Sequence, residues 1–122
     1  MWLHFYAEPV LGACGVIVPP EGYHKRTWDM CKKYDALYVS DEVVTAFGRL
    51  GRWYASKDEF EIEPDIITCA KGLYWGYLPL GATIFSDDIC DVISAPDSVS
   101  LDGPWIYVFR ASGLLCSGAK EH

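Results

Sequence analysis

The sequence predicts an α/β fold with a largely parallel sheet flanked by helices. Four short apolar runs have the length of β-strands, and two other segments mix charged and apolar residues in a helical pattern. Glycine and proline residues cluster at the ends of these runs, where turns are expected. Strands that alternate with helices are typical of parallel sheets. The chain has 122 residues, which fits one domain, and its 51% of hydrophobic residues suffices for a core.

The first part of the chain contains two expected strands and one expected helix. Residues 2–7 form a short apolar run that ends at Glu8-Pro9, and a loop rich in glycine and proline follows. Residues 23–35 carry apolar side chains among charges, which is a helical signal. Residues 36–40, "ALYVS", form the second run of strand length.

The second part continues the pattern after a span at residues 41–58 that we expect to be mostly irregular. The third strand is expected at 65–69 and the fourth at 81–85. Ser86 is expected to cap a helix whose first turn carries two aspartates, which suit the positive end of the helix dipole. Later in the chain, "PWIYVFRA" has the composition of a strand but does not fit this order.

The composition excludes several classes of partner and site. Ten Lys and Arg against 17 Asp and Glu give a net charge of −7, which argues against nucleic acid and anionic membranes. No segment reaches the roughly 18 apolar residues of a membrane helix. The five cysteines form no CxxC pair and the three histidines are far apart, so we expect no metal site. No leader pattern is visible. We expect a cytoplasmic protein, or a mitochondrial one if a presequence lies upstream.

Charged residues stand at the ends of two expected strands. Asp41 and Glu42 follow the second strand, and Lys71-Gly72 follows the third. The carboxyl ends of parallel strands meet at one edge of a sheet, where ligands bind. Lys71 is therefore a candidate amine nucleophile, and Asp41 is a candidate partner for a cation on a ligand.

Plainer interpretations of these residues stand beside this one. Asp41 can be a loop cap, and Lys71 can be an exposed lysine at a strand end. "ALYVSDE" is also similar to a Walker B strand, whose aspartate serves Mg²⁺. That reading requires a GxxxxGK[ST] loop, and the sequence contains none.

Three segments together resemble a known family. "AEPVLGACGVIVPPEGY", "KYDALYVSDEVVTAFGRLGRW" and "EPDIITCAKGLYWGYLPLGATIFS" resemble, in order, the class III aminotransferases. The resemblance covers about residues 6–94 and implies part of the large domain of a type I pyridoxal-phosphate fold. The cofactor that it implies is pyridoxal 5'-phosphate.

The resemblance also assigns roles to single residues. It implies that Asp41 pairs with the protonated pyridine nitrogen of the cofactor and that Val43 packs against the cofactor ring. Lys71 would form the Schiff base with the cofactor and later carry a proton. The attacking amine must be uncharged, and burial is one route to that state. Glu42 is expected to be structural, with Arg49 and Arg52 as its partners.

Two positions indicate a branch of the family. Relatives that act on ornithine or γ-aminobutyrate carry an acid five residues after the Glu of the E-P motif, and Ala13 stands there. They also carry Gln three residues after the pyridine-binding Asp, and Val44 stands there. Both departures resemble the ω-amino acid or amine:pyruvate transaminases. The implied reaction moves an amino group from an ω-amino acid or amine to a keto acid such as pyruvate, and the family relationship implies a homodimer.

Other parts of the family pattern do not appear in the sequence. The phosphate-binding Gly-Ser turn and the substrate-carboxylate arginine are absent, and Tyr74-Trp75 replaces a polar pair. The expected H-G-x-T-Y stretch does not follow residue 94. We therefore expect residues 1–94 to be part of the cofactor-binding large domain and 95–122 to be a divergent tail. The alternative function is a truncated, non-catalytic product that at most associates with full-length aminotransferase subunits.

Overall fold

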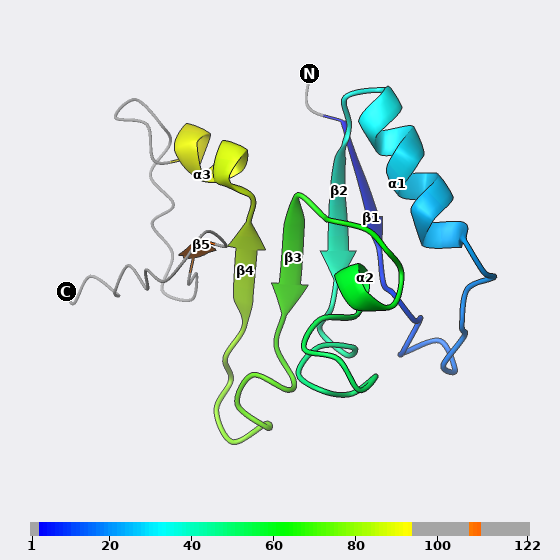
Figure 1. Ribbon diagram of the computed structural model, residues 1–122. Coiled ribbons are helices and arrows are strands. Elements are labelled where there is room, and N and C mark those ends of the chain that lie inside the picture. Colours follow the sequence, from blue (N-terminus) through cyan, green and yellow to red (C-terminus); the bar gives the residue numbers. More distant parts are fainter. Residues whose placement is uncertain (1–2, 94–107, 111–122) are drawn as a thin grey trace.

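The computed structural model describes residues 3–93 and 108–110, which form a five-stranded sheet and three helices (Figure 1). The elements follow in the order β1 (His4–Ala7), α1 (Tyr23–Lys33), β2 (Leu37–Asp41), α2 (Ala55–Asp58), β3 (Ile66–Cys69), β4 (Ala82–Phe85), α3 (Asp87–Ile93) and β5 (Val108–Arg110). The four predicted strands and both predicted helices are present, although several ends are shifted slightly. The helix α2 lies in a span that was expected to be irregular, and β5 falls within "PWIYVFRA".

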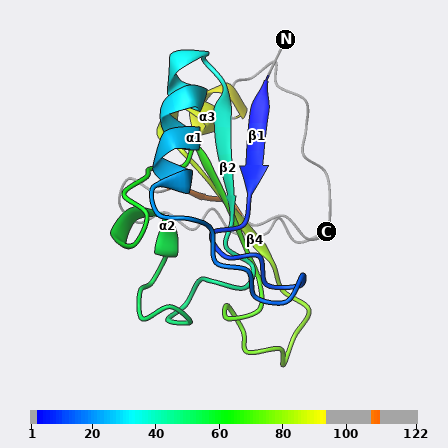
Figure 2. The ribbon, with the colours of Figure 1, turned by 90° about the vertical axis from the view of Figure 1, so that its right-hand side faces the viewer.

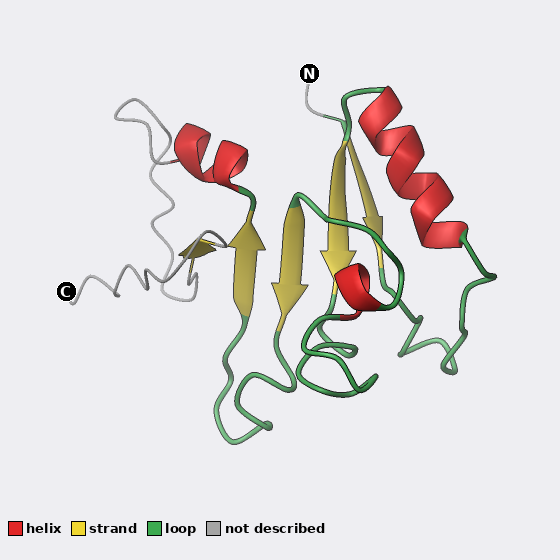
Figure 3. Cartoon of the chain, viewed as in Figure 1, coloured by secondary structure: helices red, strands yellow, loops and turns green. Residues whose placement is uncertain are grey.

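The sheet is mixed but largely parallel (Figure 3). Its strand order is β1-β2-β3-β4-β5. The pairs β1/β2, β2/β3 and β4/β5 are parallel, whereas β3 and β4 are antiparallel. The helix α1 connects β1 to β2, and the segment with α2 connects β2 to β3, because parallel neighbours require such crossovers. The predicted α/β class with a largely parallel sheet is thus confirmed.

The main hydrophobic cluster lies between α1 and the first two strands. Seen along the edge of the sheet, α1 and α2 lie on one side of it (Figure 2). Phe5 of β1 and Tyr38 of β2 pack there with Cys31 of α1 and with Ile62. Side chains alternate along a strand, so the neighbours of Phe5 and Tyr38 in the sequence point to the opposite side.

A buried histidine joins α1 to β2 and to the loop that follows β1. His24 is 3% exposed, and its Nε2 lies 2.9 Å from the Pro9 carbonyl oxygen. A carbonyl only accepts, so Nε2 carries a proton and donates it. In the neutral ring Nδ1 then accepts from the Tyr38 hydroxyl, 2.9 Å away. Burial lowers the pKa of His24, which favours this neutral form.

Candidate active site

The two charged positions of interest lie at the same edge of the sheet. Asp41 is the last residue of β2, and it pairs with Thr68 in the parallel strand β3. Lys71 lies two residues beyond the last residue of β3, Cys69. Figure 1 shows that the loops after both strands leave the sheet at the same end. The structure therefore brings Asp41 and Lys71 to one edge, as the sequence predicts for parallel strands.

Neutral donors surround the Asp41 carboxylate. The Tyr6 hydroxyl donates to Oδ2 at 2.5 Å. The Val43 backbone N–H and the Thr68 hydroxyl donate to Oδ1 at 3.0 and 3.2 Å. These donors occupy carboxylate oxygens of Asp41 without bringing a positive charge to them. Within residues 3–93, the ion pairs of the structure join other side chains, and Asp41 has no lysine, arginine or histidine as its partner.

Tyr6 and Thr68 were not predicted as site residues. Each comes from a different strand, and each lies on the same face of the sheet as Asp41 because paired residues share a face. The alternation of the first strand was a usable signal, since it separates the exposed Tyr6 from the half-buried Phe5. The pairing register that brings Tyr6 to Asp41 is not visible in the sequence.

Val43 lies where its backbone can orient Asp41. The N–H of Val43 bonds to the side chain two residues before it, which is the pattern of an Asx turn. The Val43 side chain is half-buried. Contact between this side chain and a cofactor ring stays a prediction.

Glu42 has a structural role, but its expected partners are wrong. The side chain is completely buried, and Arg49 and Arg52 are exposed. Neutral groups donate to the carboxylate instead: the Thr45 hydroxyl at 2.7 Å, the Ala55 N–H at 3.1 Å, and the N–H and hydroxyl of Ser56 at 2.8 and 2.6 Å. The first N–H groups of a helix lack partners inside it, so Glu42 caps α2 from the end of β2.

Lys71 is held in a tight turn against the loop that follows β2. The Leu73 N–H donates to the Ala70 carbonyl at 2.7 Å, and this bond closes the turn around Lys71 and Gly72. A Cβ atom added at Gly72 would lie 2.7 Å from Cβ of Phe47, closer than real Cβ contacts come. Glycine is therefore required for the backbone next to Lys71 to pack on Phe47.

Phe47 is itself fixed by aromatic neighbours. Its ring lies 5.4 Å from the Trp53 ring and 5.8 Å from the Tyr54 ring, measured between centroids. The loops after β2 and β3 thus form one packed unit. Lys71 itself is exposed in the described chain.

The two positions that indicate the substrate branch belong to segments that pack on each other. A Cβ atom at Gly12, the neighbour of Ala13, would lie 3.0 Å from Cγ2 of Val44. The Gly12 N–H donates to Oε2 of Glu8 at 2.9 Å, which holds the loop after β1 in this place. A change in either segment therefore affects the other.

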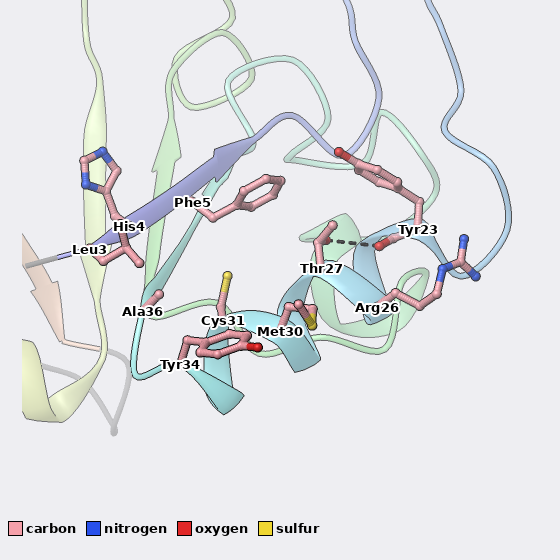
Figure 4. Close-up of a pocket in the computed structure, with 10 residues that line it drawn as sticks. All are labelled: Leu3, His4, Phe5, Tyr23, Arg26, Thr27, Met30, Cys31, Tyr34 and Ala36. Carbon is pink, nitrogen blue, oxygen red and sulfur yellow. Dashed lines mark hydrogen bonds between the residues drawn. The ribbon is translucent and has the colours of Figure 1, made fainter.

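Other features of the described residues do not form a second chemical site. In that part of the chain, no three His, Cys, Asp or Glu side chains gather as metal ligands. No helix there is long and apolar enough to cross a bilayer. A groove of about 560 Å³ lies between β1 and α1, with Phe5, Met30, Cys31 and Tyr34 among its lining residues (Figure 4). This lining is mostly apolar.

The site can be compared with the needs of pyridoxal phosphate. An ionised carboxylate among neutral donors suits a protonated ring nitrogen, which supplies the missing positive charge. An exposed lysine at the same edge suits the cofactor aldehyde. The residues present therefore fit the ring and the aldehyde of this cofactor.

Comparisons with known proteins agree with this fit. The family model "Aminotransferase class-III" matches residues 5–104, which include both sides of the expected boundary at 94. Gamma-aminobutyrate transaminase 1, mitochondrial, of Oryza sativa subsp. indica is 51% identical over 119 residues, 96% of this chain and 22% of its own length. Gamma aminobutyrate transaminase 2 of Solanum lycopersicum is 46% identical over 119 residues, 96% of this chain and 25% of its own length.

Solved structures resemble the chain in the same way. A transaminase from the marine bacterium Virgibacillus has a TM-score of 0.75 and 42% identity, over 84% of this chain and 23% of its own. An (S)-enantioselective omega-transaminase from Thermomicrobium roseum has a TM-score of 0.75 and 41% identity, over 82% of this chain and 22% of its own. The chain spans about a fifth to a quarter of the length of the curated relatives named above. It belongs to the class III aminotransferases, a family of pyridoxal-phosphate-dependent enzymes.

Proposed function

We propose that this chain supplies the cofactor-binding edge of a transaminase that moves an amino group from an ω-amino acid or amine to a keto acid such as pyruvate. The observation that carries the proposal is the placement of Asp41 and Lys71 at one edge of parallel strands. The family match supports the general reaction. The identity of the donor and acceptor is part of the proposal.

Each site residue has a role that its surroundings support. The Asp41 carboxylate holds the cationic ring nitrogen of the cofactor, because its own neighbours are neutral donors. Lys71 would hold the cofactor through its Nζ at the cofactor aldehyde, and its amine, once the substrate has displaced it, would carry the proton taken from the substrate carbon. Val43 packs against the ring. When bound, pyridoxal phosphate supplies an electron sink for the developing carbanion.

The choice of amino donor rests on two observations that differ. Ala13 and Val44 depart from the pattern of relatives that act on γ-aminobutyrate or ornithine. The curated relatives from rice and tomato are nevertheless named γ-aminobutyrate transaminases. Both observations agree on a terminal amino group as the donor, so γ-aminobutyrate, β-alanine and simple amines are the first substrates to compare.

Assembly and compartment are also proposed. A homodimer is supported by exposed apolar side chains next to Lys71, at Tyr74, Trp75, Tyr77 and Leu78. The rice relative's name includes mitochondria, whereas the tomato relative's name does not. A cytoplasmic location and a mitochondrial one after removal of a presequence both agree with these names.

The test labels Lys71 in a full-length chimaeric transaminase, which is called the carrier below. In this carrier, residues 3–93 replace the matching segment of the Virgibacillus transaminase, to which the chain is 42% identical. Borohydride reduction with pyridoxal phosphate, followed by peptide mapping, should place the label on Lys71. Lys57 is the control position, because it is an exposed residue of α2 that forms an ion pair with Glu63. A label on Lys57, or on any lysine other than Lys71, contradicts the proposal.

A further inference from the structure

We propose that Tyr6 is a positioning residue for Asp41 and that its hydroxyl holds Oδ2, the oxygen whose remaining lone pair receives a cationic ring nitrogen. The identity of this ligand rests on the proposed function. The contact between Tyr6 and Asp41 does not, because it is present in the chain itself.

The contact joins two strands across the sheet. Tyr6 of β1 pairs in register with Val39 of β2, and Asp41 is the next residue of β2 on the same face. The Tyr6 hydroxyl can therefore reach along β2 to the carboxylate. The oxygen–oxygen distance of 2.5 Å is that of a strong hydrogen bond to an ionised acceptor.

Counting acceptor sites shows what the contact does. An ionised carboxylate has about four lone-pair sites, two on each oxygen. On Asp41, the Val43 N–H and the Thr68 hydroxyl fill both sites of Oδ1. The Tyr6 hydroxyl fills one site of Oδ2. The remaining site belongs to Oδ2, so a ligand cation meets this oxygen beside Tyr6.

The tyrosine suits this role because it stays a neutral donor. The hydrogen bond to Asp41 and then burial raise the pKa of the Tyr6 phenol, so it remains protonated. A neutral hydroxyl fixes the carboxylate without neutralising it. A lysine or arginine in the same place would compete with the ligand for the charge.

The first experiment tests the contact in the 122-residue chain without cofactor. The difference between the ultraviolet titrations of the chain and of its Tyr6→Phe variant isolates the Tyr6 phenol. We expect its pKa to lie above 10, the ordinary value, and to fall toward 10 in the Asp41→Asn variant. A Tyr6 titration that Asp41→Asn leaves unchanged would overturn the proposal.

The second experiment tests positioning by binding rather than by turnover. The full-length carrier is titrated with pyridoxal phosphate and with its benzene analogue, which lacks the ring nitrogen. We expect Tyr6→Phe to reduce the preference for the pyridine ring about tenfold, the effect of losing one hydrogen bond to a charged group. Thr68→Val should reduce it less, because its bond is longer and Val43 still occupies Oδ1.

The control is Tyr34→Phe, since Tyr34 is 59% exposed beyond the end of α1 and Tyr6 is 54% exposed. This variant should keep the full preference. A Tyr6→Phe carrier that keeps it as well overturns the positioning role while leaving the proposed function intact. An unsubstituted carrier with no preference for the pyridine ring overturns the proposed function and the ligand assignment together.

Discussion

Ser56 donates two hydrogen bonds to the carboxylate of Glu42, from its backbone N–H at 2.8 Å and from its hydroxyl at 2.6 Å. The Ser56 hydroxyl also lies 2.8 Å from that of Ser40 in β2. A single buried carboxylate therefore ties the end of β2 to the start of α2. The loop that lies between these two points includes Phe47, on which the backbone beside Lys71 packs.

Replacing Glu42 by glutamine should destabilise the fold. The amide has one acceptor oxygen in place of two, and its NH₂ group would face the N–H donors of α2. Leaving a buried donor unsatisfied costs about 1–3 kcal/mol. We expect the free energy of unfolding to fall by that amount, measured by urea denaturation with tryptophan fluorescence. The control is Glu63→Gln, which removes only an exposed ion pair with Lys57 and should leave the urea midpoint unchanged. Equal losses in both variants would contradict the capping role.

Gly72→Ala should strain the turn that carries Lys71. The new methyl group would lie 2.7 Å from Cβ of Phe47, which is fixed to its own backbone and cannot swing away. Overpacking of this kind typically costs about 1–3 kcal/mol. We expect lower stability and slower labelling of Lys71 by pyridoxal phosphate in the full-length carrier. Gly81→Ala is the matched control, because the nearest atom to its Cβ is 3.6 Å away. Normal labelling in Gly72→Ala would show that the contact with Phe47 does not place Lys71.

The sequence predicts those helices and strands that local residue patterns determine. The apolar runs and their bounding turns located β1 to β4, and Ser86 with two aspartates located α3. The helix α2 was missed because four residues are too few for a periodic pattern and because its cap, Glu42, is distant in the sequence. Side-chain periodicity cannot supply such a long-range partner.

The residues of the candidate site likewise divide into those that a local pattern predicts and those that depend on the fold. Asp41 and Lys71 were predicted because each follows an apolar run, and parallel strands bring such ends together. Tyr6 and Thr68 depend on the register between strands, which no local pattern encodes. The arginines near Glu42 were chosen by charge alone, but the buried carboxylate is satisfied by neutral donors whose places only the fold defines.

The buried His24 predicts a loss of stability in mild acid. Burial lowers the pKa of the folded-state imidazole below the ordinary value of 6.5. Below about pH 6.5 the unfolded chain therefore binds the proton more readily than the folded chain. The contribution of His24 is fully present above pH 6.5 and is lost as the pH falls toward the lowered value. The slope from this one group reaches at most about 1.4 kcal/mol per pH unit.

Urea midpoints between pH 7.5 and 5.5 would measure this effect. His24→Gln should flatten the pH dependence, since the amide can still donate to the Pro9 carbonyl but does not titrate in this range. His4→Gln is the control, because His4 is exposed on β1. If His24→Gln shows the same acid sensitivity as the unchanged chain, another group is responsible.

Asp41→Asn should severely reduce turnover in the full-length carrier. An amide does not stabilise the positive charge on a ring nitrogen, so the electron sink weakens. We expect kcat/KM to fall about 10³-fold or more, which corresponds to about 4 kcal/mol of transition-state stabilisation. Asp29→Asn is the control, because Asp29 is exposed on α1 and pairs only with Lys25 among the described residues. Near-normal turnover in Asp41→Asn would refute the role of Asp41 and restore the Mg²⁺ interpretation of its strand.

The isolated chain of 122 residues should not transaminate. It contains the carboxylate proposed for a ring nitrogen and the amine proposed for an aldehyde, but it spans only about a fifth of the length of the rice relative. The phosphate of the cofactor is normally held by backbone N–H groups and hydroxyls at a helix start or turn. The sequence carries no Gly-Ser turn that resembles the family's phosphate site. Lys71 is also exposed, so nothing in the described residues shields a reactive centre at this position from hydrolysis.

The measurement is alanine formation from pyruvate and γ-aminobutyrate, with the purified chain and added pyridoxal phosphate. The full-length carrier under the same conditions is the positive control. We expect alanine from the carrier and none above background from the chain. If the chain associates with full-length subunits, as the alternative function proposes, adding it to the carrier should change the carrier's elution volume without adding activity. Sustained alanine formation by the chain alone, abolished by Lys71→Ala, would show that this segment is sufficient for catalysis.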